Sequence, residues 1–385
     1  MSKLSSFSLA IVVGVVMAPV MAAPAIMLVG IDTKFWFDDK GGRVFQSDSG
    51  DTVQVYELHD PAHPILIGAL SLPNSVVGPP TNLGVTPDGK LALIANAIVV
   101  EDGKPKPDNR LFVVDLAARP LRTIATVEVG AQPSGLAISP DGTMALVTNR
   151  AGKAVTVLSI QGTAVTVTDT VAMDEVVTSA AFTPDGKRAL ISEYAAHRVA
   201  LLDIENGKVK RTTVTPTVGL WPYTVAVTPD GRLGLASSTG DQATSDGSID
   251  PVAVIDLAAA PPRTVDFVAA GDSVEGLVVS PRGDYAAATI LQGSLDAPRG
   301  AWFAHRTGSV ALLRIKNGAV TLAGRTDVGA FPQGIAFSPD GDWVYVGNFA
   351  SRSISVLHLV NGRLVDAYAD IDLPGPPASL RVGSQ

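Results

Sequence analysis

A four-residue phrase, Ser or Thr followed by Pro-Asp-Gly, recurs along the chain and limits the folds it can adopt. Copies begin at Thr86, Ser139, Thr183, Thr228 and Ser338, and a variant, Ser-Pro-Arg-Gly, begins at Ser280. The shortest spacing is about 44 residues, the length of a propeller blade of four short strands. In a tight hairpin Ser or Thr bonds the turn backbone, Pro presets φ, Asp tolerates the bridge conformation and Gly takes a positive φ. The phrase therefore predicts a turn inside a repeated β unit.

Short apolar segments flank each turn in the pattern of β-strands. ALIAN, ALVTN, ALISE and VYVGN follow four of the turns, at residues 92–96, 145–149, 189–193 and 344–348. A third, β-branched segment comes next in each unit. Asn206-Gly207 and Asn317-Gly318 are strong signals for a two-residue hairpin into a fourth strand. Four antiparallel strands per unit and no helical periodicity predict an all-β β-propeller.

Six units carry the phrase, and the N-terminal region supplies a seventh. Residues 35–37 and 44–47 look like a degenerate copy, and residues 53–58 and 65–70 complete it. The tail at residues 377–382 (PASLRV) also resembles a first strand. We expect one terminus to fill a gap in the other's blade and close a seven-bladed ring. The sequence leaves open which strand closes it.

ALVTN, ALIAN and VYVGN, each about one strand after an S/T-P-D-G turn, are similar to the YVTN β-propeller repeat. The resemblance covers almost the whole chain after its first residues and implies a lactonase-like seven-bladed propeller. That superfamily holds phosphogluconolactonase and muconate-lactonising relatives, cell-surface repeat proteins, propeller subunits of amine dehydrogenases and binding proteins. Its lactonases carry a His-rich stretch at the start of an inner strand, whereas the equivalent stretches here contain no histidine. A fold shared by several chemistries does not select one of them.

The first residues have the features of a secretory signal peptide. Lys3 gives a positive start, residues 7–20 are mostly apolar, and small residues follow at Ala22 and Ala23. An apolar run of about 14 residues is too short to span a bilayer. We therefore expect a signal peptide at 1–22, a propeller domain at 23–385 and a periplasmic or secreted location, with no membrane span after cleavage.

Composition excludes several classes of function. The chain contains no cysteine, which removes disulfides, thiol nucleophiles, Cys-ligated zinc and covalent haem. Its formal net charge of −8, without a long basic run, argues against general nucleic-acid binding. It has no Gly-x-Ser-x-Gly elbow, phosphate-binding loop or dinucleotide fingerprint. Because histidine and carboxylate spacings fit no zinc site, we expect neither a metal nor a cofactor.

Insertions relative to the basal unit indicate where a ligand would bind. They fall at residues 97–109, 240–250 and 291–308, each between the second and third strands of a unit. These connections lie on the face opposite the Pro-Asp-Gly turns. Repeat proteins commonly bind through the face that carries insertions. We expect a small anionic ligand or a periplasmic protein partner to bind there.

Two sets of residues on that face are candidates for binding. In the third insertion, Arg299, Trp302 and Arg306 suit an anionic, partly apolar ligand, because guanidinium binds carboxylate with two hydrogen bonds; the alternative is a solvated loop packed over the disc through Trp302. The second set consists of strand-end residues and the residues beside them: Asn96, Asn149, Asn348, Arg150, Tyr194, Trp221 and Tyr223. The alternative is that the strand-end side chains cap the backbone of neighbouring strands.

Three residues are catalytic candidates. Glu193 is the only carboxylate at the strand ends and so the preferred general base, and His197 is placed to pair with it. His305 lies in the third insertion, beside Arg306. Trp221, Tyr223, Glu275, Phe331 and Gln333 come from connections between blades, where aromatic residues can form a wall or seal the blade junctions.

Three functions are compatible with these patterns. The first is an exported, non-catalytic propeller that binds a ligand or protein, or serves as a scaffold, through the insertion face. The alternative is a lactonase-like hydrolase or isomerase acting on a small anionic lactone or sugar acid, which predicts that Glu193, His197, Arg299 and His305 converge on one pocket. A second alternative is the propeller subunit of a periplasmic dehydrogenase, which requires a partner chain.

Overall fold

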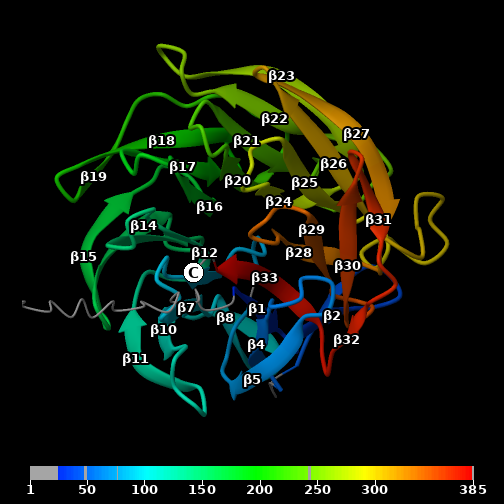
Figure 1. Ribbon diagram of the computed structural model, residues 1–385, viewed down its shortest axis with the longest axis horizontal. Coiled ribbons are helices and arrows are strands. Elements are labelled where there is room, and N and C mark those ends of the chain that lie inside the picture. The colour runs from blue at the N-terminus through cyan, green and yellow to red at the C-terminus, as the bar shows by residue number, and fades with distance from the viewer. Residues whose placement is uncertain (1–24, 47–49, 76, 242–243, 384–385) are drawn as a thin grey trace, which may run out of the picture.

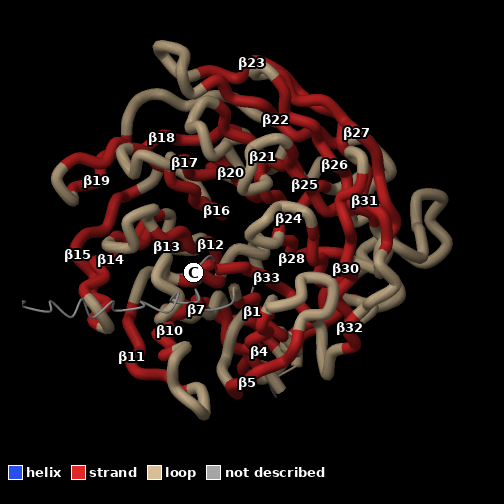
Figure 2. Tube along the Cα trace, in the orientation of Figure 1, coloured by secondary structure: helices blue, strands red, loops and turns tan. Residues whose placement is uncertain are grey.

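The computed structural model describes residues 25–46, 50–75, 77–241 and 244–383. Over these ranges the regular elements are strands joined by loops, with no α-helix (Figure 2). Seven antiparallel sheets stand side by side around a central axis as the blades of a β-propeller (Figure 1). The predicted all-β, seven-bladed fold is therefore confirmed. The predicted signal peptide lies outside the described residues.

Each blade is a sheet of four strands numbered here from the axis outward. Blades 1 to 4 are β33 (Pro377–Gly383), β1 (Ile26–Ile31), β4 (Thr52–Glu57), β5 (Ile65–Ser71); β6 (Leu83–Val85), β7 (Leu91–Ala95), β10 (Arg110–Asp115), β11 (Arg122–Glu128); β12 (Pro133–Ile138), β13 (Met144–Asn149), β14 (Ala154–Gln161), β15 (Ala164–Ala172); and β16 (Val177–Phe182), β17 (Arg188–Glu193), β18 (Arg198–Glu205), β19 (Lys208–Arg211). Blades 5 to 7 are β20 (Pro222–Val227), β21 (Leu233–Ser238), β22 (Asp250–Asp256), β23 (Arg263–Gly271); β24 (Val274–Val279), β25 (Tyr285–Ile290), β26 (Ser309–Lys316), β27 (Ala319–Asp327); and β28 (Pro332–Phe337), β29 (Trp343–Asn348), β30 (Ser353–Val360), β31 (Arg363–Asp366), with β32 (Ile371–Asp372) also paired to β30.

The C-terminal tail closes the ring. Strand β33 pairs antiparallel with β1, from Ile26 opposite Gly383 to Val29 opposite Leu380, and so becomes the innermost strand of blade 1. This confirms that one terminus fills the other's blade and assigns the closing strand.

The assignment of residues 35–37 and 44–47 to blade 1 was wrong. Residues 35–37 and 44–46 lie in or next to β2 (Phe35–Phe37) and β3 (Arg43–Phe45), a separate hairpin inserted between β1 and β4, and residue 47 lies outside the described residues. The hairpin is apolar because it packs over blade 7, where the Phe35 ring stacks on Phe349 with centroids 4.8 Å apart. The fully buried β1 is the true second strand of the blade.

The Pro-Asp-Gly turns use the predicted chemistry. In blade 2 the Thr86 hydroxyl donates to Asp88 Oδ1 at 2.7 Å and accepts from the Leu91 N–H at 3.0 Å, and Gly89 has φ +68°. Blade 6 differs, because Arg282 replaces the aspartate. Its Nη1 instead donates to Asp342 Oδ1 at 2.6 Å, linking this turn to blade 7.

The turns into the fourth strands also match the prediction. Asn206 and Gly207 have φ +52° and +75°, and Asn317 and Gly318 have +53° and +79°. Positive φ at both central residues is the type I′ turn that matches strand twist.

The hydrophobic core lies between neighbouring blades. Between blades 5 and 6, for example, Leu235 and Val254 pack with Leu277 and Leu313. Each such side chain contributes roughly 1.5–3 kcal/mol when fully buried. The chain thus stabilises its fold without a disulfide.

Four long connections join second to third strands on the face opposite the Pro-Asp-Gly turns, called here the insertion face. Besides the β2–β3 hairpin, they are the connection carrying β8 (Ile98–Glu101) and β9 (Lys104–Pro107), and those after β21 and β25. Across the described ranges, no helix is long and apolar enough to cross a bilayer.

Candidate functional site

One side-chain position repeats where the innermost strands begin, near the axis at the insertion face. It lies five residues before the Ser or Thr of each turn, and its occupants are Thr81, Ser134, Thr178, Tyr223, Glu275 and Gln333, with Ala378 at the matching place in β33. We call these residues the axial ring. Neighbouring members make contact across blades, since Gln333 Nε2 donates to Glu275 Oε2 at 3.0 Å.

Several polar atoms of the axial ring are buried without a partner. Thr178 Oγ1 is satisfied, because it lies 2.6 Å from Ser192 Oγ and also donates to backbone carbonyls of blade 5. Thr81 Oγ1, Ser134 Oγ and Gln333 Oε1, in contrast, have no hydrogen-bond partner among the described residues. An unmet buried polar group costs about 1–3 kcal/mol. The ring therefore has unused capacity to hydrogen-bond a molecule that enters it.

Glu275 carries the carboxyl group of the ring. Its side chain is only 8% exposed. Burial and, after it, the negative charge of Asp296 raise its pKa from 4.5 to about 8, although the Gln333 hydrogen bond and the charges of Arg43 and Arg150 act in the opposite direction. The carboxyl is therefore mostly protonated at neutral pH and can donate a hydrogen bond or a proton.

A cationic and aromatic cluster lies beside Glu275. The Arg150 guanidinium sits over the Tyr194 ring, 4.7 Å from its centroid. The Tyr194 centroid is 4.8 Å from that of Trp221 and 5.9 Å from that of Tyr223. Four of the predicted ligand-binding residues, from blades 3, 4 and 5, are thus brought together. His197 supports them, since its Nδ1 accepts the Trp221 N–H at 3.0 Å.

Arg43 was missed by the sequence analysis. It belongs to β3 of the inserted hairpin, far from this cluster in sequence. Burial raises the pKa values of Tyr194 and Tyr223, and the positive charges of Arg150 and Arg43 partly offset that effect. Arg43 therefore adds a second positive charge near the axial ring. No local sequence motif predicts this position of Arg43, because only the folded β2–β3 hairpin brings Arg43 near the axial ring.

Glu193 lies within blade 4 and is fully buried. It accepts hydrogen bonds from Arg198 Nε and, at 2.8 Å, from Arg211 Nη2. Two ion pairs hold its charge in place, so its carboxylate is engaged by the protein itself. The last residue of a second strand points toward the third strand of its own blade, which accounts for this position.

The three strand-end asparagines are engaged in the same way. Each is fully buried and bonds within its own blade: Asn96 Nδ2 to the Ile98 carbonyl at 3.0 Å, Asn149 Nδ2 to Thr156 Oγ1 at 2.8 Å, and Asn348 Nδ2 to Ser353 and Ser355 hydroxyls at 3.1 and 2.9 Å. Their amide nitrogens brace the blades, whereas their three Oδ1 atoms are buried with no hydrogen-bond partner among the described residues.

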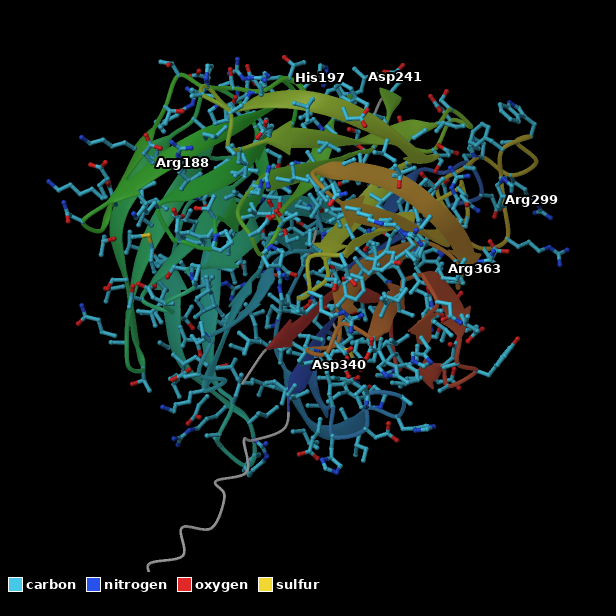
Figure 3. The ribbon with its side chains drawn as sticks, turned by 45° about the horizontal axis from the view of Figure 1, so that its top comes forward. Arg188, His197, Asp241, Arg299, Asp340 and Arg363 are labelled. Carbon is cyan, nitrogen blue, oxygen red and sulfur yellow. The ribbon has the colours of Figure 1, made fainter. Side chains whose placement is uncertain are left out.

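The third insertion lies apart from the cluster. Trp302 is 82% exposed and contacts Phe303 edge-on at 5.6 Å. Arg299 sits on a loop at the margin of the disc (Figure 3), with its nearest paired carboxylate, Asp39, 3.9 Å away. Arg306 and His305 are exposed on the same loop. Within the described residues, no contact joins Glu193, His197, Arg299 and His305 into one site.

Two carboxylates near the ring, Asp272 of the connection between blades 5 and 6 and Asp250 of β22, tie that connection to the insertion after β21. Asp272 accepts the N–H groups of Asp246 and Gly247 at 3.1 and 3.0 Å, and Asp250 accepts that of Ser273 at 2.9 Å. Burial raises the pKa of Asp250 to about 6. Among the described residues, no three His, Asp or Glu side chains are arranged to hold a metal ion.

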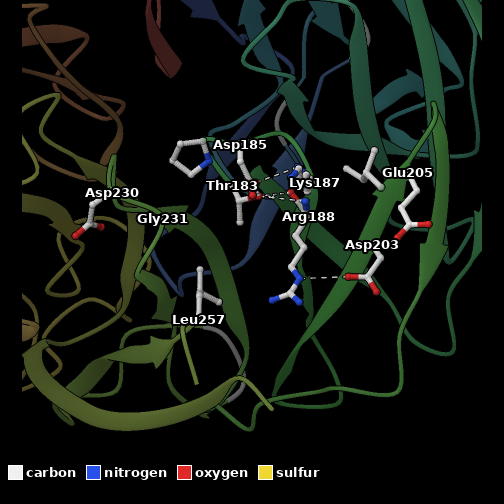
Figure 4. Close-up of a pocket in the computed structure, with 11 residues that line it drawn as sticks. Thr183, Asp185, Lys187, Arg188, Asp203, Glu205, Asp230, Gly231 and Leu257 are labelled. Atoms are coloured by element: carbon white, nitrogen blue, oxygen red, sulfur yellow. Dashed lines mark hydrogen bonds and ion pairs between the residues drawn. The ribbon is translucent and has the colours of Figure 1, made fainter. Parts of the chain in front are cut away.

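A groove of about 600 Å³ lies on the opposite face, between blades 4 and 5 (Figure 4). Its polar groups already serve the turns: Asp185 Oδ1 accepts the Thr183 hydroxyl and the Lys187 N–H, and Arg188 pairs with Asp203 at 3.3 Å. The chemistry-bearing cluster is therefore at the axial ring rather than in this groove.

Comparison with solved structures agrees with this architecture and defines the chain as a seven-bladed β-propeller. A candidate 6-phosphogluconolactonase of Bacteroides uniformis superposes with a TM-score of 0.72 at 17% identity, over 94% of this chain and 100% of its own. The periplasmic gluconolactonase of Pseudomonas aeruginosa has a TM-score of 0.66 at 18% identity, over 94% and 99%. Hydrazine synthase of Kuenenia stuttgartiensis has 0.61 at 21%, over 80% and 91%.

At these identities the likeness shows the fold alone. No protein-family model and no curated protein matches the chain. The chain is thus similar in structure to lactonase-like propellers, and its YVTN assignment rests on the motifs of its sequence.

Proposed function

We propose that this propeller binds a small anionic, hydroxyl-bearing molecule of the sugar-acid class at the axial ring. The observation that carries the proposal is the set of buried, unpartnered polar atoms at Thr81, Ser134 and Gln333 beside two arginines. Hydroxyl groups of a ligand would complete the missing hydrogen bonds. Arg150 and Arg43 would attract its negative charge, which guanidinium groups do well.

The aromatic residues suit the same ligand. Tyr194, Trp221 and Tyr223 present ring surfaces next to Arg150. The carbon face of a sugar ring packs on such surfaces while its hydroxyl groups reach the polar ring. The structural similarity to propellers described as gluconolactonases supports a small molecule over a protein partner.

Lactone hydrolysis is a second candidate function, favoured by Glu275. A carboxyl with a pKa of about 8 beside the ligand site can exchange a proton near neutral pH. As a carboxylate it would take a proton from water while the water oxygen attacks the lactone carbonyl carbon. The bond from that carbon to the ring oxygen then breaks, and the carboxyl returns the proton to that oxygen, giving the open hydroxy acid. Since Glu275 is the base, the rate rises as the pH increases through about 8.

Titration calorimetry with a panel of sugar acids and their lactones tests binding. Replacing Arg150 with Ala removes a charged hydrogen-bond donor worth about 1.5–3 kcal/mol and should weaken binding roughly 10-fold or more. Arg299→Ala is the matched control, because Arg299 is exposed at the margin of the disc. Equal losses in both variants, or no binding to the wild-type protein, would refute the axial site.

Turnover is tested separately by following acid release from the lactones that bind. If Glu275→Gln binds them normally but loses turnover, the hydrolase function is supported. If the wild-type protein binds lactones without hydrolysing them faster than buffer does, the protein is a binding module only.

A further inference from the structure

An unpaired arginine lies beside the axis at the seam where the ring closes. Arg381 is in β33, the innermost strand supplied by the C-terminal tail, opposite Leu28 of β1. Figure 1 shows this strand running toward the centre of the disc. The Arg381 side chain is partly buried.

The position is unusual for a charge. Counted back from the turns, the matching residues of the other innermost strands are small or apolar and neutral: Gly84, Ala137, Ala181, Ala226, Val278 and Ala336. Only the closing strand places a long cationic side chain at this level. Arg381 is therefore not required by the packing of a repeat unit.

The contacts of Arg381 leave most of its guanidinium free. Its Nε donates to the carbonyl oxygen of Leu83, on the innermost strand of blade 2, at 3.2 Å. The guanidinium thus lies between two innermost strands. In the part of the chain that the structure describes, no carboxylate pairs with it. Burial lowers its pKa, and no neighbouring charge acts on it in either direction.

Two other buried charges of this protein, those of Lys34 and Glu193, are neutralised by ion pairs. Lys34 pairs with Asp32 and Asp51, and Glu193 pairs with Arg198 and Arg211. A charge taken out of water without a partner costs free energy that a counter-ion recovers. Arginine keeps its charge under all ordinary conditions, so it cannot relieve this cost by losing its proton.

We propose that Arg381 is the centre of an anion site beside the axis, for a small oxyanion such as phosphate or a carboxylate. With Nε held by Leu83, the two terminal nitrogens provide N–H groups in the planar fork that binds such oxygens. The site is separate from the axial ring and does not depend on the sugar-acid proposal. Its ligand would join blade 1 to blade 2 at the closing seam and so stabilise the closed ring.

Thermal unfolding tests this site, with phosphate or formate replacing chloride at constant ionic strength. A ligand that binds only the folded protein raises Tm. We expect a saturable rise of about 3 °C for the wild-type protein, a weaker rise for Arg381→Lys and none for Arg381→Gln, which can still donate to Leu83. Arg299→Ala should respond as the wild type does, because Arg299 is an exposed residue of the third insertion at the margin of the disc. A rise of the same size in Arg381→Gln, or no rise in the wild type, would overturn the proposal.

A measurement without variants covers the case in which Arg381→Gln fails to fold. Crystals of the wild-type protein soaked in selenate should show an anomalous peak within hydrogen-bond distance of the Arg381 guanidinium. Selenate at other positions only would overturn the proposal.

Discussion

Glu275 couples the stability of this propeller to pH, and Glu275→Gln should remove that coupling. The variant keeps the size of the side chain and its ability to bond Gln333, but it cannot ionise. In the folded protein the carboxyl has a pKa of about 8, against an ordinary value of 4.5. Between these two values the folded state holds a proton that the unfolded state has lost. Stability contributed by this group is therefore full below about pH 4.5 and falls as the pH rises toward 8.

The size of the effect follows from the two pKa values. One pKa unit corresponds to about 1.4 kcal/mol, so the displacement of Glu275 corresponds to at most about 5 kcal/mol. Denaturant unfolding at half-unit steps from pH 5 to 9 measures it. We expect the wild-type protein to lose stability over this range and Glu275→Gln to lose several kcal/mol less. Parallel curves for the two proteins would show that Glu275 ionises as easily folded as unfolded and would refute the reasoning.

Asp250→Asn is the matched comparison for that experiment. Burial raises the pKa of Asp250 to about 6 from an ordinary 3.8. Its contribution therefore disappears at lower pH, between about 4 and 6. The Asp250→Asn curve should differ from the wild-type curve mainly in slope below about pH 6, whereas Glu275→Gln should differ up to about pH 8. If both variants changed the same part of the curve, the two carboxyls would not titrate independently.

Three further predictions concern the fold. Arg211→Ala leaves the buried Glu193 carboxylate with one partner fewer, and should lower the free energy of unfolding by about 3 kcal/mol, with much less loss for Arg211→Lys. A Cβ at Gly276 would overlap a backbone carbonyl of blade 7, whereas one at Gly324 meets nothing within 4 Å; denaturant unfolding should show Gly276→Ala to be clearly less stable than Gly324→Ala, and similar values would argue against close packing of the inner strands. Deleting residues 377–385 removes β33, so the thermal transition should lose its cooperativity; an unchanged transition would mean that blade 1 does not need its closing strand.

The sequence predicted the repeating architecture well because each blade carries local signals. The Ser or Thr of the turn, its aspartate and its glycine act within a few residues of one another, and the same holds for the Asn-Gly turns. The hairpin at 35–45 was misassigned because its aromatic residues look like strand residues of a blade, although Phe35 packs on Phe349 from the other end of the chain. Long-range packing of this kind leaves no local pattern.

Part of the candidate site was predictable because its residues also follow the repeat pattern of the blades. Four residues lie at equivalent strand ends or connections of the repeat: Arg150, Tyr194, Trp221 and Tyr223. Because equivalent positions of neighbouring blades lie close together near the axis, the repeat pattern predicts their proximity. Glu193 also lies at an equivalent strand end, but its carboxylate forms ion pairs with two arginines of its own blade. Which way a strand-end side chain turns depends on the partners across the sheet, and a single sequence does not reveal them.

The position of the closing strand in the sequence also determines when the ring of blades can close during synthesis. Residues 377–383 leave the ribosome after the other strands of all seven blades, yet they form the innermost strand of the blade that begins at Ile26. Until they emerge, blade 1 lacks the strand nearest the axis, and blades 7 and 2 have no inner neighbour between them. The six other blades can form as synthesis proceeds, but the ring as a whole closes only after residues 377–383 have emerged. A propeller built in this way forms its closed ring late, when β33 pairs with β1.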